Sequence, residues 1–139
     1  MKYWDSSALV SLIVEEPRST ERRAAVRRDP AIVTWWGSRV ECASALNRLQ
    51  RDRRFEVGEL DRGLEQLRRL AASWLEIEPM EQVRNRAIRL LRLHPLRAAD
   101  ALQLAAALTA AAEDPQRLDL VSSDDRLSAA AQREGFRVL

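Results

Sequence analysis

The sequence predicts an α/β fold in which helices cover both faces of a mostly parallel sheet. Short apolar segments alternate with longer amphipathic ones, joined by short links, along all 139 residues, and this order is typical of βαβ units. The hydrophobic fraction is 46% with only 5% aromatic residues, which indicates an Ala- and Leu-rich core with much helix. The length suits one ordinary domain, so we expect residues 1–139 to form a single domain.

The first elements follow from the polar residues that interrupt apolar segments. Residues 1–4 form a short apolar strand, and Ser6 or Ser7 is placed to cap a helix over the apolar residues 8–14. Pro17 is favoured at a helix start and opens an Arg-rich helix that runs to about residue 28.

The middle of the chain alternates in the same way. Residues 31–34 are β-branched and predict a strand, followed by a turn at residues 35–37. A helix over 38–52 comes next, and apolar residues at helical spacing predict another over 60–74. Residues 75–78 then form a brief strand, which we expect at a sheet edge.

The last third continues the alternation. Pro79 starts a helix that runs to about residue 93, and Pro95 starts another that ends before Asp114. We expect a strand over 119–122, a helix over 124–134 closed by Gly135, and a last strand over 136–139.

Four acidic residues lie either inside an apolar segment or near a helix start at the expected carboxyl edge of the sheet. Asp5 and Asp124 directly follow predicted strands, and sites in parallel sheets form at the carboxyl ends of strands. Asp100 interrupts an apolar run over 98–108, about one turn inside its predicted helix, so we expect its side chain to point inward. A buried carboxylate is costly unless a cation or hydrogen-bond donors compensate it. The fourth acid, Glu41, lies near the start of the helix over 38–52.

Taken singly, each acid also has a structural explanation. Asp5 and Asp124 could cap helices. The sequence of Ser38 to Glu41 matches a capping box, in which the glutamate reaches back to the cap residue. Asp100 has no capping explanation at its predicted depth, and its structural alternative is a buried ion pair with an arginine.

Together the four acids match a family pattern. The chain resembles PIN-domain nucleases over essentially its whole length, and most closely the VapC-type toxin ribonucleases of bacterial toxin–antitoxin pairs. The resemblance rests on four blocks in order: YWDSSAL at 3–9, SRVECASAL at 38–46, HPLRAADALQLA at 94–105 and VSSDDRL at 121–127. The acidic quartet of the family corresponds to Asp5, Glu41, Asp100 and Asp124, here called the four acids. The neighbouring Asp125 leaves open which member of the pair is the ligand.

The resemblance implies an α/β/α sandwich around a short parallel sheet, dependence on Mg²⁺ or Mn²⁺, RNA cleavage, a cognate antitoxin and a homodimer. Crowded carboxylates need a cation, because like charges raise one another's pKa, and oxygen ligands favour Mg²⁺ or Mn²⁺. We assign Asp5 and Asp100 as principal metal ligands and all four acids as catalytic. Glu41 and Asp124 would bind a second ion or position the water. Ser6 and Ser122 are supporting residues, and Ser122 keeps a hydroxyl where the family commonly has Thr.

Three arginines adjoin these acids and are expected to contact RNA phosphates: Arg39, Arg97 and Arg126. The alternative for Arg97 is an intrahelical ion pair with Asp100, three residues later. Of the 23 basic residues only Lys2 is a lysine, which is compatible with phosphate binding, although a GC-rich genome would by itself produce this bias.

Several classes of protein are excluded or disfavoured. A single cysteine and a single histidine leave no disulfide and no zinc site of the thiolate–imidazole kind. No signal peptide and no apolar run of about 20 residues is present, so we expect a cytoplasmic protein without membrane contact. A receiver domain normally needs a lysine after its last strand, and the only lysine here is Lys2, so this class is disfavoured. The remaining alternative is a PIN-like module that binds RNA or protein without cutting.

Overall fold

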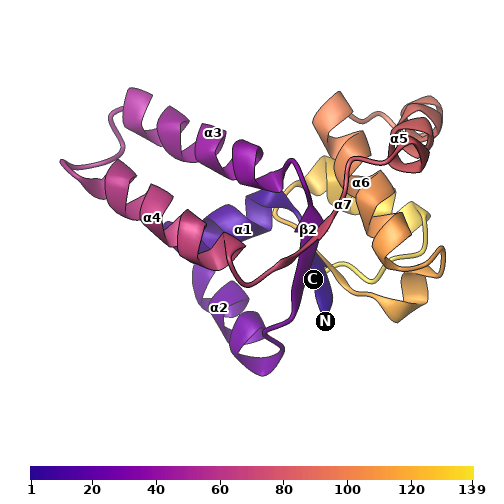
Figure 1. The fold of residues 1–139 in the computed structure, drawn as a ribbon, viewed down its shortest axis with the longest axis horizontal. Coiled ribbons are helices and arrows are strands. Elements are labelled where there is room, and N and C mark those ends of the chain that lie inside the picture. The colour runs from indigo at the N-terminus through magenta and orange to yellow at the C-terminus, as the bar shows by residue number, and fades with distance from the viewer.

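The computed structural model describes all residues 1–139 and contains a four-stranded parallel sheet between two layers of helices (Figure 1). The strand order is β3-β2-β1-β4. The strands are β1 (Lys2–Trp4), β2 (Ile32–Trp35), β3 (Leu75–Ile77) and β4 (Leu120–Val121). The helices are α1 (Ser6–Ile13), α2 (Ser19–Arg28), α3 (Ser38–Arg51), α4 (Glu59–Ala71), α5 (Glu81–Leu93), α6 (Ala98–Ala110), the short 3₁₀ helix η1 (Pro115–Arg117) and α7 (Asp125–Arg133). The predicted three-layer α/β/α fold with a short parallel sheet is confirmed.

The sheet divides the interior into two hydrophobic cores, because successive side chains of a strand point to opposite faces. Tyr3 and Val33 belong to the core formed with α5, α6 and α7. Trp4 and Ile32 belong to the core formed with α1 to α4. Figure 1 shows these two groups of helices on opposite sides of β2. Both faces of the two central strands, β1 and β2, are therefore covered, which explains their mostly apolar sequences.

The register of the central strands brings two distant segments of the chain together. Trp4 of β1 pairs with Val121 of β4, and the N–H of Asp5 donates to the carbonyl of Val121 at 3.1 Å. The segments that leave the two strands, starting at Asp5 and at Ser122, therefore lie side by side at the carboxyl edge of the sheet.

Helix α6 begins later than predicted, and this changes the position of Asp100. The helix starts at Ala98 and not at Pro95, because His94 is extended before the proline and Arg97 is still extended (φ −81°, ψ 164°). Asp100 is consequently the third residue of the helix. The prediction that it lies about a turn inside the helix is wrong.

Other boundaries also differ from the predictions. Asp5, and not Ser6 or Ser7, caps α1. Helix α4 ends at Ala71, although Trp74 beyond it is buried. The predicted strand over 136–139 is reduced to one parallel bridge between Leu120 and Val138, because β4 offers only two residues for pairing. The predicted edge position of β3 is confirmed.

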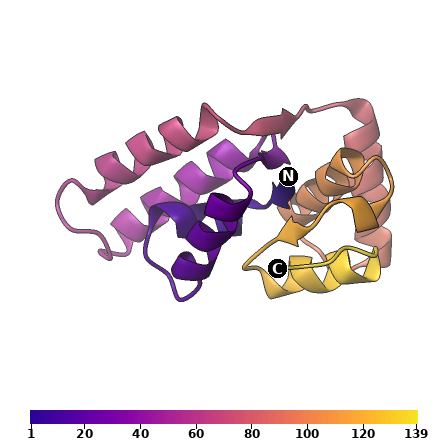
Figure 2. The same ribbon diagram turned by 90° about the horizontal axis from the view of Figure 1, so that it is seen from below.

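Helices α3 and α4 form a long hairpin that projects away from the sheet, as Figure 2 shows from below. None of the helices combines the length and the hydropathy needed to cross a bilayer.

Candidate functional site

The four acids lie at the starts of four different helices around the end of β1. Asp5 is the N-cap of α1 and Asp124 is the N-cap of α7. Asp100 and Glu41 lie in the first turns of α6 and α3. The N-terminus of a helix carries partial positive charge, so each position favours an ionised carboxylate.

Asp5 is the most deeply buried acid, with 3% of its surface exposed. Its Oδ1 accepts the N–H of Ala8 at 2.9 Å, and its Oδ2 accepts the hydroxyl of Ser122 at 3.1 Å. The Ser7 hydroxyl lies 2.9 Å from both carboxylate oxygens. Burial raises the pKa of Asp5 to about 6, and the charge of Asp124 adds to this, whereas the three donors oppose it. The carboxylate is held by neutral donors without an ion pair.

Glu41 links three helices and does not close the predicted capping box with Ser38. Gly37 is the residue that precedes α3, and Ser38 already belongs to the helix. The Oε2 atom of Glu41 instead accepts the hydroxyl of Ser6 at 2.6 Å and the side-chain amide of Gln103 at 3.0 Å. The side chain therefore points from α3 toward α1 and α6.

Asp100 and Asp124 line an open cleft of about 500 Å³, here called the acid cleft, whose other lining residues are Arg97, Asp125 and Arg126. The Oδ2 atom of Asp100 accepts the backbone N–H of Arg97 at 3.3 Å, so this acid does have a capping role. Partial burial raises the pKa of Asp100, and the charge of Asp124 raises it further, whereas the hydrogen bond from Arg97 and the charges of the two arginines lower it. Asp100 thus faces the cleft and not the deep interior that the sequence predicted.

The adjacent acids Asp124 and Asp125 differ in their surroundings. Asp124 is partly buried, and its Oδ1 accepts the N–H of Leu127 at 2.8 Å. Asp125 is exposed and begins the helix. Only Asp124 has a charge that perturbs both Asp5 and Asp100, so it is the member of the pair that belongs with the other acids.

The three predicted RNA-contact arginines are not equivalent. Arg97 and Arg126 line the acid cleft and form no ion pair with Asp100, so the alternative of an intrahelical pair is absent. Arg39 is exposed on the first turn of α3 and does not line the cleft.

Four residues that were not predicted as part of the site complete the surroundings of the acids. Ser7 accepts the N–H of Ser123 at 2.8 Å while bonding Asp5. Arg22 is buried in α2, and its Nη2 donates to the carbonyl of Ser122 at 2.6 Å, while its Nε has no partner. Tyr3 and Gln103 form a buried hydrogen bond of 2.7 Å. Gln103 interrupts the same apolar run as Asp100, which is a signal in the sequence; nothing distinguishes Arg22 from its arginine neighbours.

The donor set suits a hard divalent cation. The four acids offer only oxygen, and none of them takes part in an ion pair. No three side chains of His, Cys, Asp or Glu lie close enough together to hold an ion by themselves. Mg²⁺ commonly takes one or two carboxylates and completes its shell with water and substrate phosphates. The residues therefore fit such an ion as part of its shell.

The neighbouring thiol takes no part in this chemistry. Cys42 is fully buried, and burial raises its pKa to about 12, with the charges of Glu41 and Asp5 adding to the effect. The thiolate is the reactive form of cysteine, so Cys42 is inert at neutral pH.

Comparison with known families now identifies the fold. The family described as PIN domain matches residues 2–133. The chain belongs to the PIN domain family. A solved structure titled "Toxin-antitoxin complex from Klebsiella pneumoniae" superposes on this PIN domain with a TM-score of 0.64 and 17% identity, covering 93% of this chain and 91% of the other. A search of curated proteins finds no match.

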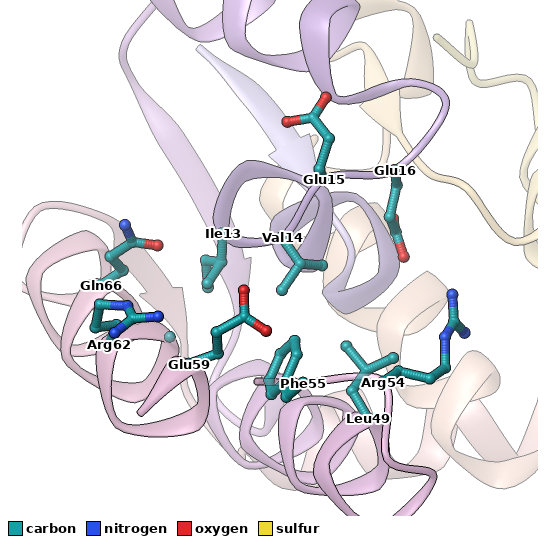
Figure 3. Close-up of a pocket in the computed structure, with 11 residues that line it drawn as sticks. Ile13, Val14, Glu15, Glu16, Leu49, Arg54, Phe55, Glu59, Arg62 and Gln66 are labelled. Carbon is teal, nitrogen blue, oxygen red and sulfur yellow. The ribbon is translucent and has the colours of Figure 1, made fainter. Parts of the chain in front are cut away.

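A second cavity, of about 370 Å³, lies between the end of α1 and the α3–α4 hairpin of this PIN domain. Figure 3 shows Phe55 and Leu49 beside Val14, with the charged side chains of Glu59 and Arg62 nearby. Glu16 lines this cavity and also a third one, which reaches Ser6 and Glu41. The two cavities thus extend from Glu41 toward the hairpin.

The burial of Asp5 predicts a pH-dependent stability in the absence of metal. The folded protein binds the Asp5 proton more tightly than the unfolded chain, because its pKa rises from 3.8 to about 6. The stabilisation by that proton is complete below the unfolded pKa and is lost as the pH rises through the folded one. Asp5→Asn keeps the cap and lacks the charge. We expect the free energy of unfolding of this variant to exceed that of wild type by about 1–3 kcal/mol at neutral pH.

Urea unfolding in EDTA, at about pH 4 and about pH 7.5, measures this difference, which should shrink toward zero at the lower pH. The exposed Asp125→Asn is the matched control and should show little change. An Asp5→Asn protein that is less stable than wild type at both pH values would show that the Asp5 charge stabilises the fold.

Proposed function

We propose that this PIN domain, spanning residues 1–139, is a metal-dependent ribonuclease toxin that a cognate antitoxin neutralises. The observation that supports the proposal best is the position of each of the four acids at the start of a helix, with neutral donors on Asp5 and no protein cation paired to any of the four. Carboxylates that are partly or fully buried and have no basic partner in the protein are stabilised in their ionised form by an external cation.

The four acids divide into two pairs of roles. Asp5 and Asp100 are the principal ligands of Mg²⁺ or Mn²⁺, which when bound would activate water for attack on a phosphodiester and stabilise the leaving oxygen. Glu41 and Asp124, on either side, orient the attacking water or complete the ion's shell. Ser6 fixes the Glu41 carboxylate, and Ser122 fixes that of Asp5.

RNA is the proposed substrate because cations adjoin the acids without neutralising them. Arg97 and Arg126 line the acid cleft free of ion pairs, so their guanidinium groups are available for phosphate oxygens. Arg39 is exposed at the start of α3 and would contact phosphates farther along the strand.

An antitoxin is the proposed protein partner. The similar structure from Klebsiella pneumoniae is titled as a toxin–antitoxin complex, and the cavities that share Glu16 lead from Glu41 toward the α3–α4 hairpin. Trp36 is 50% exposed and offers apolar contact, whereas Trp35 is buried and packs in the core. A homodimer is proposed from the family resemblance alone.

Metal-dependent cleavage tests the nuclease directly. We expect purified, antitoxin-free protein to cut RNA with Mg²⁺ or Mn²⁺ and to lose this activity in EDTA. Asp100→Asn should reduce the rate by about 100-fold or more, because it removes a metal ligand. It should keep the melting temperature, since asparagine can still accept the N–H of Arg97.

The outcomes separate the nuclease from a non-catalytic module. RNA that binds but stays intact with every metal ion would indicate a PIN-like binding module. Near-normal cleavage by Asp100→Asn would remove that residue from the site, and unfolding of the variant would assign it a structural role.

The acid pair at the start of α7 gives a second prediction. Asp124→Asn keeps the cap on Leu127 and removes the charge that faces Asp5 and Asp100, so cleavage should fall about 100-fold. Asp125→Asn changes an exposed residue and should cost less than about threefold. Both are measured in one cleavage assay, and a larger loss in Asp125→Asn would exchange their roles.

The toxin role has its own test in living cells. Expression without the antitoxin should slow bacterial growth, and Asp100→Asn should restore it at equal protein level, because growth arrest then depends on cleavage. Normal growth with active wild-type protein would contradict the toxin role and leave the nuclease assignment intact.

A further inference from the structure

Gln103 is a buried polar residue that contacts one of the four acids. It lies on α6 with 2% of its surface exposed. Its Oε1 accepts the hydroxyl of Tyr3 at 2.7 Å, and its Nε2 donates to Glu41 Oε2 at 3.0 Å and to Ser38 Oγ at 2.9 Å. Each polar atom of the amide is therefore satisfied, and the residue joins β1, α3 and α6.

The surroundings permit only one orientation of this amide. A reversed side chain would place its oxygen against the Glu41 carboxylate, where two acceptors would repel each other, and its N–H groups against Tyr3. The hydrogens of the amide are then both used, one on Glu41 and one on Ser38.

The network continues in a fixed direction beyond Ser38. Thr34 Oγ1 lies 2.6 Å from the carbonyl of Trp4 and 2.7 Å from Ser38 Oγ. A carbonyl can only accept, so the single hydroxyl hydrogen of Thr34 goes to Trp4 and the hydrogen of Ser38 goes to Thr34. The network thus ends on the backbone of the central strand, next to Asp5, and holds Gln103 in place.

The consequence for Glu41 is a carboxylate fixed by one oxygen. The donors from Gln103 and Ser6 both act on Oε2, and no hydrogen bond reaches Oε1. Glu41 projects from α3, and α6 also carries Asp100, so an amide that ties Glu41 to α6 fixes the distance between two of the four acids.

We propose that Gln103 is a positioning residue that holds Glu41 by its Oε2 atom and leaves Oε1 to face the cation. The inference rests on the proposed function, because it makes Gln103 responsible for part of the metal affinity of that same site. Partners of metal ligands typically account for about a 10- to 100-fold difference in metal affinity. The residue touches neither substrate nor metal.

The experiment measures metal binding by thermal unfolding with Mn²⁺ or EDTA, without RNA. Metal bound to the folded state raises the melting temperature, and a Mn²⁺ titration gives the concentration for half of the rise. Gln103→Met keeps the side-chain length and removes the amide, and we expect this concentration to increase about tenfold. Thr109→Val on the same helix is the matched control, because its hydroxyl bonds only the carbonyl of Ala105, and it should titrate like wild type.

A second variant guards against loss of folding. Gln103→Met leaves the Tyr3 hydroxyl without its partner, whereas combining it with Tyr3→Phe removes both buried polar groups, an exchange that is often close to neutral for stability. The combined variant should show the same tenfold weakening of Mn²⁺ binding.

A double-mutant cycle with Glu41→Gln separates positioning from general packing. If Gln103 acts through Glu41, Gln103→Met should have no further effect on Mn²⁺ binding in the Glu41→Gln background. An equal Mn²⁺ titration in wild type and Gln103→Met, or an undiminished effect in the Glu41→Gln background, would overturn the inference. Wild-type protein that binds Mn²⁺ but never cuts RNA would overturn the proposed function alone.

Discussion

The structure depends on a buried carboxylate at the end of its central strand. Asp5 lies where β1 leaves the sheet, beneath the starts of the surrounding helices, and is 3% exposed. Its charge is expensive there, and the fold compensates it with the N–H of Ala8 and the hydroxyls of Ser7 and Ser122. Each of these donors is fixed by another contact or by secondary structure, so the segments around β1 and β4 are organised about one side chain.

Arg22 supports this arrangement from helix α2. It reaches the carbonyl of Ser122 from α2 and so holds the residue whose hydroxyl bonds Asp5. Asp5 opposes the lowering of the Arg22 pKa by burial, yet the two groups form no ion pair. A buried cation that is held by a backbone carbonyl orders the loop without occupying the carboxylate.

Much of this architecture could be predicted from sequence, because short apolar segments that alternate with amphipathic ones indicate a parallel sheet covered by helices. Asp5 and Asp124 could be placed at the same edge because both follow strands. The position of Asp100 could not, since it depends on where α6 begins, and the extended residues His94 and Arg97 on either side of Pro95 and Leu96 delay that start. The hydrogen-bond partner of Glu41 on α6 could not be predicted from sequence either. A capping box is a local pattern, whereas the actual partner, Gln103, is 62 residues away.

The capping explanation and the functional explanation of the acids turn out to be compatible. Asp5 and Asp124 cap helices, Asp100 bonds a backbone N–H at a helix start, and Glu41 lies in a first turn. A helix start stabilises negative charge through its dipole and its free N–H groups, and a capping bond needs only one carboxylate oxygen.

An arginine partner would neutralise the same charge and fill the space beside it. Helix starts therefore lower the cost of gathering four acids while leaving oxygen atoms free to bind a cation. No ion pair of the structure includes one of the four acids, so no basic side chain occupies these carboxylates.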